Sequence, residues 1–489
     1  MDQRQHAQPS LRRSGMGSQR MIFRKPLIIL AAIATLCITI PIQAAIPATL
    51  VKDIYPGVGD SYPGGLKNVN GTLFFGALDE NGRRLWQTNG TPDSTKPVDY
   101  GASLRDIWPL TNFKNRLYFS ATATGYGNEL WSTAGTAAST TLVKYINPGA
   151  GNSYPMFFMD IGNMVLFSAD DGIHGDELWK TDGTPEGTVL VKDINPGATS
   201  IYPSFGFVVI NQTMFFAADD GVTGRELWKS DGTLEGTVLV KDINPGTGGS
   251  ISSGFNPGFI NVGSVFYFVA DDGVHGTELW KSDGTPEGTQ LVADVVLGTE
   301  GSTPRSLTNV NGTIFFMSYR SGSDHQLWKT GGTAASTAFV APVGAICGPG
   351  CTQLTAVNNL LFFVNFDPTH GLELWRSDGT PAGTTIVKDI FPGSTGSDVG
   401  ELTSVNGKLI FRAGDGPGIN AWQSDGTTEG TFLLADVGQS SGSSFPAEFT
   451  LVGNQLFFSA RTPSTGRELY VLQLPSVTTN TVFLPMIVQ

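Results

Sequence analysis

The sequence predicts an all-β protein: a β-propeller-like array of about nine four-stranded repeats, forming one closed ring of eight or nine blades. Three observations support this fold class. A short motif recurs at nearly constant spacing, the segments between its copies alternate like short strands, and turn-forming residues are abundant. The chain has 62 Gly and 28 Pro among 489 residues and only 15% charged residues, a composition that disfavours helices.

One aromatic residue in each repeat marks the series. The segment 177–184 reads Glu-Leu-Trp-Lys-Thr-Asp-Gly-Thr and returns, with small changes, at 226–233, 278–285 and 373–380. Successive anchor aromatics lie 45 to 52 residues apart. They are Trp86, Trp131, Trp179, Trp228, Trp280, Trp328, Trp375, Trp422 and Tyr470. We expect each anchor to pack between neighbouring repeats as a structural residue, and not to form a sugar-stacking platform.

The repeat over residues 188–237 shows how each unit is built. Residues 188–194 alternate and are β-branched, as in a strand, and Asn195-Pro196-Gly197 follows as a turn. Further strands are expected at 205–210, 214–218 and 226–229. Four short antiparallel strands in so few residues match a propeller blade and leave no room for a crossover helix. Two smaller rings or a solenoid are the alternatives, but locally paired strands favour blades.

The repeated Glu-Leu-Trp-x-x-Asp-Gly-Thr core resembles the ELWxxDGT-repeat proteins of bacteria, over about residues 48–474. The resemblance implies an exported β protein with many repeats and supplies no defined activity. The second and sixth repeats depart from the motif, with Ala134-Gly135-Thr136 and Gly331-Gly332-Thr333 in place of the acidic turn. The last copy ends after Tyr470.

The chain is expected to divide into a signal peptide at 1–44, the repeat propeller at 45–474 and a C-terminal tail at 475–489. Basic residues up to Lys25 precede an apolar run at 27–40, and small residues follow, as in a secretory signal. The run is shorter than the roughly 20 residues of a spanning helix, so an uncleaved anchor is the less favoured alternative. We therefore predict a secreted or cell-surface protein whose mature chain has no stable transmembrane span. The tail reads as an added strand or a sorting element.

The net charge of the mature chain limits its expected partners, and its two cysteines indicate the compartment. Removal of residues 1–44 takes away six basic residues and one acidic residue, which moves the net charge from −13 to −18. Such a surface excludes nucleic acid as a partner. The two remaining cysteines, Cys347 and Cys351, flank Gly-Pro-Gly, and we expect a local disulfide between them in an oxidising compartment.

Asp-Asp-Gly turns are the best candidates for metal binding. They contain Asp170, Asp171, Asp219, Asp220, Asp271 and Asp272. Paired carboxylates can bind calcium, but calcium needs six to eight oxygens and these turns offer too few nearby. The favoured interpretation is a plain hairpin turn, so no cofactor is predicted and calcium is the one candidate ion.

The expected function is an exported, non-catalytic repeat scaffold. Its propeller loops would serve surface adhesion or bind an extracellular protein or glycan that the sequence does not identify. No catalytic residue is assigned, because the acids mostly belong to the repeat. The non-repeated acids show no recognisable pairing; they are Asp106, Asp160, Asp324, Glu401 and Glu448. The alternatives are a carbohydrate-active propeller enzyme and a calcium-stabilised, matrix-type repeat protein.

Overall fold

The computed structural model describes residues 44–98, 104–107, 110–149, 151–197, 200–201, 206–252, 258–319, 325–344, 353–437 and 442–475. The chain divides into two units, Met1–Gln43 and Ala44–Gln489, and the fold below is that of the second. Most of the predicted signal peptide, the pair Cys347 and Cys351, Asp324 and the tail beyond residue 475 lie outside the described residues. No helix within the described ranges is long and apolar enough to cross a membrane.

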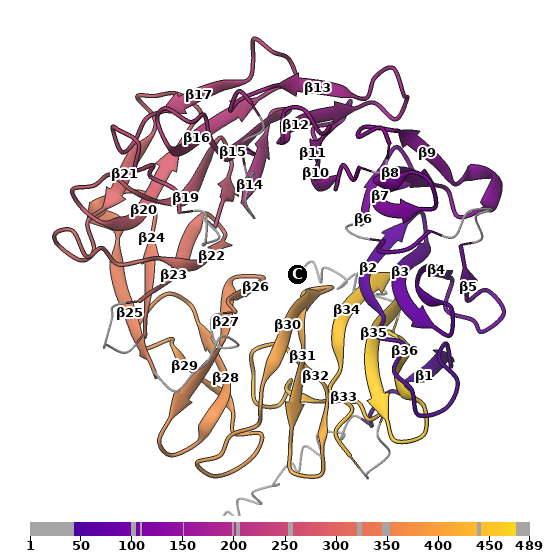
Figure 1. Ribbon diagram of the computed structural model, residues 1–489. Coiled ribbons are helices and arrows are strands. Elements are labelled where there is room, and N and C mark those ends of the chain that lie inside the picture. Colours follow the sequence, from indigo (N-terminus) through magenta and orange to yellow (C-terminus); the bar gives the residue numbers. More distant parts are fainter. Residues whose placement is uncertain are drawn as a thin grey trace, which may run out of the picture. The chain divides into compact units, whose positions relative to one another are not determined.

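The second unit is a β-propeller of nine blades, each a four-stranded antiparallel sheet (Figure 1). The prediction of an all-β closed ring is therefore confirmed, and nine is the blade number. The two smaller rings and the solenoid are ruled out, because the sheets follow one another around a single circle. Two three-residue 3-10 helices are the only helices that the described residues form: η1 (Ala137–Ser139) and η2 (Ala334–Ser336).

The strands are numbered in chain order and grouped here by blade. Blades 1 to 3 contain β2 (Gly64–Val69), β3 (Thr72–Asp79), β4 (Gly82–Thr88), β5 (Lys96–Pro97); β6 (Leu110–Phe113), β7 (Arg116–Ala123), β8 (Gly127–Thr133), β9 (Thr141–Lys144); and β10 (Met156–Asp160), β11 (Val165–Asp170), β12 (Asp176–Thr181), β13 (Val189–Lys192). Blades 4 to 6 contain β14 (Phe207–Ile210), β15 (Thr213–Asp219), β16 (Arg225–Ser230), β17 (Val238–Lys241); β18 (Ile260–Val262), β19 (Val265–Asp271), β20 (Thr277–Ser282), β21 (Gln290–Ala293); and β22 (Arg305–Val310), β23 (Thr313–Ser318), β24 (His325–Thr330), β25 (Ala338–Val343). Blades 7 to 9 contain β26 (Thr355–Val357), β27 (Leu360–Asp367), β28 (Gly371–Ser377), β29 (Thr385–Lys388); β30 (Gly400–Val405), β31 (Lys408–Gly414), β32 (Ile419–Ser424), β33 (Phe432–Ala435); and β34 (Ala447–Val452), β35 (Gln455–Thr462), β36 (Gly466–Gln473) with β1 (Thr49–Lys52).

Each blade runs outward from the axis of the ring. The first strands of neighbouring blades contact each other, for example β30 with β34 and β34 with β2, so they form the inner wall. Because successive strands are antiparallel, the propeller has two faces with different loops. We call one the DGT face, which carries the Asp-Gly-Thr loops between third and fourth strands. The other is the DDG face, which carries the turns between second and third strands.

The anchor aromatics lie between blades. Trp228 of blade 4 packs with Ile161, Leu178 and Val191 of blade 3, and Tyr470 of blade 9 packs with Val405 of blade 8. Seven of the nine anchors are buried, whereas Trp328 and Trp375 are half-buried. In each case the ring fills the space against the preceding blade, so the structure places the series in the core of the ring and not on its surface.

The glutamate of the repeated motif is a second internal support. Glu226 is fully buried and accepts hydrogen bonds from the backbone N–H groups of Ile243 (3.0 Å) and Asn244 (3.3 Å) and from the Ser250 hydroxyl (2.5 Å). It therefore holds the connection that leads from the outer strand of one blade to the inner strand of the next. Without it, buried donors would lack partners, which costs stability.

The same glutamate contact closes the ring. β1 pairs with β36 and completes blade 9, so the first and last strands of the propeller belong to one sheet. Glu468 accepts hydrogen bonds from the Ile54 and Tyr55 N–H groups, both at 3.2 Å, and from the Ser61 hydroxyl at 2.6 Å. Closure in this way leaves no open stack of blades with unpaired strand edges.

Candidate functional site

The Asp-Asp-Gly turns of the DDG face are hairpin turns whose carboxylates are largely engaged. Asp171 Oδ1 accepts hydrogen bonds from the N–H groups of Ile173 and His174, and Oδ2 lies 2.8 Å from His174 Nδ1. The turns of blades 4, 5 and 7 repeat this pattern, with a Thr replacing the His in blade 4. The described residues contain no group of three or more His, Cys, Asp or Glu side chains that could hold a metal ion. Calcium binding by the six turn aspartates stays a prediction.

The Asp-Gly-Thr loops use their carboxylates in a similar way. Asp182 Oδ1 accepts hydrogen bonds from the Thr184 hydroxyl (2.7 Å) and N–H (2.8 Å). The hydroxyl bond lowers the pKa of Asp182. These loops are locally self-sufficient, so their repetition needs no ligand to explain it.

Exposed aromatic side chains lie where the chain enters three of the inner strands at the DDG face. Tyr62, Tyr154 and Phe445 are 54%, 54% and 40% exposed, and each stands between a buried serine and a proline. Their φ angles are 44°, 41° and 43°, in the left-handed region that bulky residues rarely adopt. Thr303 and Asp398 share this conformation in other blades, so the backbone geometry belongs to the fold. The exposed rings belong to these three blades only among the described residues, and we call them the rim aromatics.

Two non-repeated glutamates lie in blades 8 and 9, next to the blades that carry the rim aromatics Phe445 and Tyr62. Glu401 and Glu448 are the second residues of the neighbouring inner strands β30 and β34, with φ angles of 57° and 62°. In blade 1 the same position is Gly65, with a φ of 64°. The sequence analysis found no pairing between these two acids. The ring places them at the same position of the inner strand in adjacent blades.

Three arginines accompany the glutamates. Arg412 Nη1 lies 3.8 Å from Glu401 Oε1, and the buried Arg412 Nε has no hydrogen-bond partner among the described residues. Arg83 Nη1 donates to the Tyr62 carbonyl (3.2 Å), and Arg467 Nη1 donates to the Phe445 carbonyl (3.0 Å). Both arginines are thereby tied to the backbone of a rim aromatic.

The charges of blades 8, 9 and 1 influence each other. Burial lowers the pKa of Arg83, and the charge of Glu448 opposes that shift. Burial likewise lowers the pKa of Arg467, which the neighbouring Asp60 opposes and the nearby Arg412 reinforces. We call Arg83, Glu401, Arg412, Glu448 and Arg467 the axial cluster. It combines two carboxylates, three guanidinium groups and nearby exposed rings, which together can bind a polar polymer and move protons on it.

Sequence patterns alone did not reveal the axial cluster. Asp106 and Asp160 lie in blades 2 and 3, so the structure does not join them to Glu401 and Glu448. Aligning the repeats on their anchor aromatics could have revealed the pair. Glu401 and Glu448 are 47 residues apart, and the anchors of the same blades, Trp422 and Tyr470, are 48 apart.

Comparisons with known proteins do not place the chain in a family. No family model matches it, and no curated protein matches it. The resemblance to ELWxxDGT-repeat proteins therefore stays a prediction from the motif.

Several solved structures are similar in fold at low identity. A puromycin-hydrolyzing peptidase of Mycobacterium tuberculosis is 10% identical, with 76% of this chain and 61% of that chain covered and a TM-score of 0.37. A structure from a study of two prolyl endopeptidases is 10% identical, with coverages of 74% and 54% and a TM-score of 0.40. An uncharacterized protein from Listeria monocytogenes is 9% identical, with coverages of 80% and 98% and a TM-score of 0.39. The chain thus spans a little over half the length of the two peptidases, and no activity transfers at such scores.

The predicted function is corrected at this point. The non-catalytic adhesion scaffold is contradicted by the comparisons, since the similar structures with a named activity are hydrolases, puromycin-hydrolyzing and prolyl peptidases. The sequence analysis treated the non-repeated acids as scattered, whereas the ring brings Glu401 and Glu448 to neighbouring strands.

Proposed function

We propose that this chain is a carbohydrate-active enzyme whose reaction takes place at the axial cluster on the DDG face. The observation that carries the proposal is the placement of Glu401 and Glu448 at one register of the neighbouring inner strands β30 and β34. Cleavage of a glycosidic bond commonly uses two carboxyl groups, one on each side of that bond. Two such groups on rigid inner strands supply the required pair.

The two glutamates stand at a position of the inner strand where the fold uses a left-handed backbone. Both residues adopt left-handed conformations, which cost a non-glycine residue about 1–2 kcal/mol. Blade 1 avoids the cost with Gly65, whereas Glu448 accepts it while its side chain stays exposed and buries little surface. Phe157 in β10 and Ser306 in β22 hold the same position with φ angles of 55° and 56°, so the carboxylates of Glu401 and Glu448, and not their backbone, distinguish blades 8 and 9.

The surrounding residues suit an extended carbohydrate. The rings of Tyr62 and Phe445 are exposed next to the cluster and offer flat apolar faces for sugar rings. The guanidinium groups of Arg83 and Arg467 are fixed by the carbonyls behind those rings. Hydroxyl or carboxylate groups of a sugar would meet these donors without much side-chain rearrangement.

The test is product release from a panel of polysaccharides, measured as new reducing ends or unsaturated products, with the full secreted chain. We expect activity on at least one polymer, and losses of at least about 100-fold in kcat for Glu401→Gln and Glu448→Gln. Glu235→Gln is the matched control, because Glu235 is an exposed acid in a loop of the DGT face.

Two outcomes would contradict the proposal. One is product release that both glutamate variants retain in full. The other is cleavage of peptides, with no polysaccharide cleaved, by the same preparation. Unfolding curves of each variant separate a lost reaction from a lost fold.

A further inference from the structure

Three Asn-Gly pairs form the same hairpin turn in different blades. They lie at 70–71, 311–312 and 406–407, between the first and second strands of blades 1, 6 and 8, on the DGT face. A valine precedes each pair, and φ is positive at both residues, from 49° to 51° at asparagine and from 73° to 89° at glycine. This is the two-residue turn that Asn-Gly favours. The three pairs share a backbone conformation and a local sequence, so their surroundings can be compared directly.

The chemical stability of such a pair depends on the N–H group of its glycine. When this nitrogen loses its proton to solvent and attacks Cγ of the asparagine, the bond from Cγ to Nδ2 breaks, ammonia leaves and a cyclic imide forms. Water then opens the imide to aspartate or isoaspartate. Glycine has no Cβ to obstruct the attack, and asparagine is a thermally labile residue. An acceptor that holds the N–H group opposes the reaction, because a hydrogen bond to the neutral form of a group disfavours its deprotonated form.

The turns of blades 1 and 6 hold the glycine N–H group. Asn68 Oδ1 accepts a hydrogen bond from the Gly71 N–H group at 3.0 Å. Asn309 Oδ1 accepts one from the Gly312 N–H group at 2.7 Å. Asn309 is itself fixed, since its Nδ2 donates to the Asn261 carbonyl at 3.3 Å. In both turns the acceptor stands two residues before the asparagine of the pair, and it protects that asparagine from attack.

The turn of blade 8 lacks this acceptor. Ser404 stands at the corresponding position, and no described residue accepts a hydrogen bond from the Gly407 N–H group. Asn358 of blade 7 donates to the Gly407 carbonyl at 3.0 Å, which leaves the N–H group unaffected. Asn406 is exposed, and its amide makes no hydrogen bond with the residues that the structure describes. Neither reacting group of this pair is therefore restrained by the protein.

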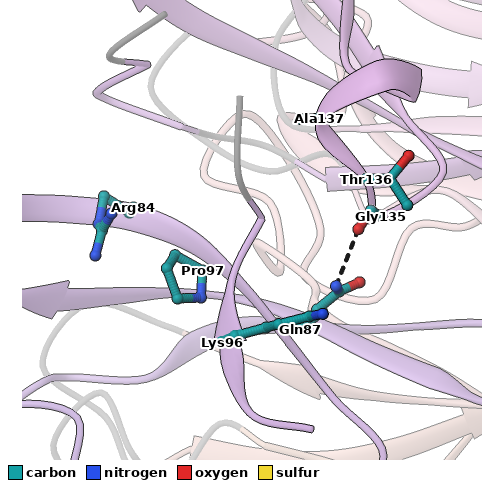
Figure 2. Close-up of a pocket in the computed structure, with 7 residues that line it drawn as sticks. All are labelled: Arg84, Gln87, Lys96, Pro97, Gly135, Thr136 and Ala137. Carbon is teal, nitrogen blue, oxygen red and sulfur yellow. Dashed lines mark hydrogen bonds between the residues drawn. The ribbon is translucent and has the colours of Figure 1, made fainter. Parts of the chain in front are cut away.

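The other two Asn-Gly pairs, at 81–82 and 89–90, belong to blade 1 and are restrained. The Gly90 N–H group donates to Thr88 Oγ1 at 2.9 Å, and Gly82 pairs with Asp79 in the ladder of β3 and β4. A neighbouring side-chain amide is held as well, because Gln87 Nε2 donates to a backbone carbonyl of blade 2 at 2.9 Å (Figure 2). Among the five pairs, 406–407 alone combines an exposed asparagine with an N–H group that no described residue binds.

We propose that Asn406 is the principal site of spontaneous deamidation in the folded chain. Asparagine and water give aspartate or isoaspartate and ammonia, and the reaction needs neither an enzyme nor an oxidant. The product places a carboxylate on the DGT face of blade 8. Isoaspartate also lengthens the main chain of the hairpin between β30 and β31 by a methylene group. The modification is independent of the reaction proposed at the axial cluster.

The test is incubation of the full folded chain at mildly alkaline pH in heavy-oxygen water, followed by peptide mapping with mass spectrometry. The isotope enters only when water opens the imide during the incubation, so earlier damage is not counted. We expect Asn406 to convert about fivefold faster than Asn70, the factor that one ordinary hydrogen bond contributes to an equilibrium. An assay that methylates isoaspartate selectively measures the second product.

Exchanging the acceptor between two turns provides matched variants. Ser404→Asn gives blade 8 the acceptor of the other turns and should slow the conversion of Asn406 to the rate of Asn70. Asn68→Ser removes the acceptor from blade 1 and should accelerate Asn70 about fivefold while leaving Asn406 unchanged. Both variants are expected to fold, because other blades carry these residues at the same position.

The chain unfolded in guanidinium is the control for local sequence. There the three hairpin pairs should convert at similar rates, since each is preceded by valine. Three results would overturn the proposal: equal rates at the three pairs in the folded chain, the same excess at Asn406 after unfolding, or a rate at Asn406 that Ser404→Asn leaves unchanged.

Discussion

Blades 3 to 5 and blades 8, 9 and 1 are built on the same sheet and differ in what they carry. In blades 3 to 5 the polar residues repeat, and each is used within the fold: Asp171 by its turn, Glu226 by the blade connection and Asp283 by its loop. Blades 8, 9 and 1 add charged residues that the other blades lack at these positions, with Glu401, Glu448 and Arg83 among them. The comparison teaches that the repeated residues describe the scaffold and that candidate chemistry lies where the repeat is broken.

The largest expected effect is the loss of stability when a buried anchor aromatic is removed. Trp228→Ala removes a buried ring at the boundary of blades 3 and 4 and should lower the free energy of unfolding by about 3–5 kcal/mol. Trp328→Ala should cost less, because that ring is only half-buried. Urea unfolding followed by tryptophan fluorescence measures both. Equal losses for the two variants would contradict the packing described for the anchors.

The next effect tests the motif glutamate. Glu226→Ala leaves the buried N–H groups of Ile243 and Asn244 without this partner, at a cost of about 1–3 kcal/mol for each group. The exposed Glu235→Ala is the control and should stay within about 0.5 kcal/mol of the unsubstituted chain. Thermal unfolding at one pH compares them, and similar melting temperatures would argue against a supporting role for Glu226.

A broader effect concerns pH. Burial raises the pKa of Glu177 to about 8 and of Glu278 and Glu468 to about 7. Between the pKa of 4.5 expected for the unfolded chain and these folded values, the folded state binds more protons than the unfolded state. The stability that the three protonated groups contribute is therefore lost as pH rises through about 7 to 8. The melting temperature should be lower near pH 9 than near pH 5.

A matched variant isolates the contribution of one carboxyl group. Glu278→Gln removes a titrating group while keeping a side chain of the same shape, so its melting temperature should depend less steeply on pH. A melting temperature that increases from acid to alkaline pH in the unsubstituted chain would contradict the assignment.

The smallest expected change in the free energy of unfolding best distinguishes residues of the scaffold from residues of the candidate site. Glu448→Gly relieves a left-handed non-glycine residue and should raise the free energy of unfolding by about 0.5–1 kcal/mol. The same change should abolish the proposed reaction. Glu235→Gly, made at an exposed loop position, is the control for the effect of glycine itself. A destabilised Glu448→Gly variant would show that the glutamate serves the fold.

The fold was predictable because its signal is repeated. The anchor spacing, the alternating strands and the Gly-bearing turns all pointed to blades, and a strand such as 188–194 was expected close to its observed outer strand, β13. The exact number of blades was not predictable, because β1 and β36 share one sheet and the count depends on how the two ends meet.

The candidate site was not predictable from local patterns. Glu401 and Glu448 carry no motif, and the arginines Arg83, Arg412 and Arg467 come from second or third strands at different distances along the chain. Their proximity depends on how far each side chain reaches across its blade. The positive φ angles at this position of the inner strands are likewise a property of the folded backbone and leave no mark in the composition.

The pairing of β1 with β36 has a consequence for how the molecule is made. Ile54 and Glu468 are 414 residues apart, so the first strand to emerge from the ribosome is among the last to find its partner. Contacts so distant in sequence form slowly, and β1 has to wait with an unpaired edge until the final hairpin is synthesised. A nascent chain halted before blade 9 therefore keeps β1 without a partner strand, and it can pair with the edge of another chain.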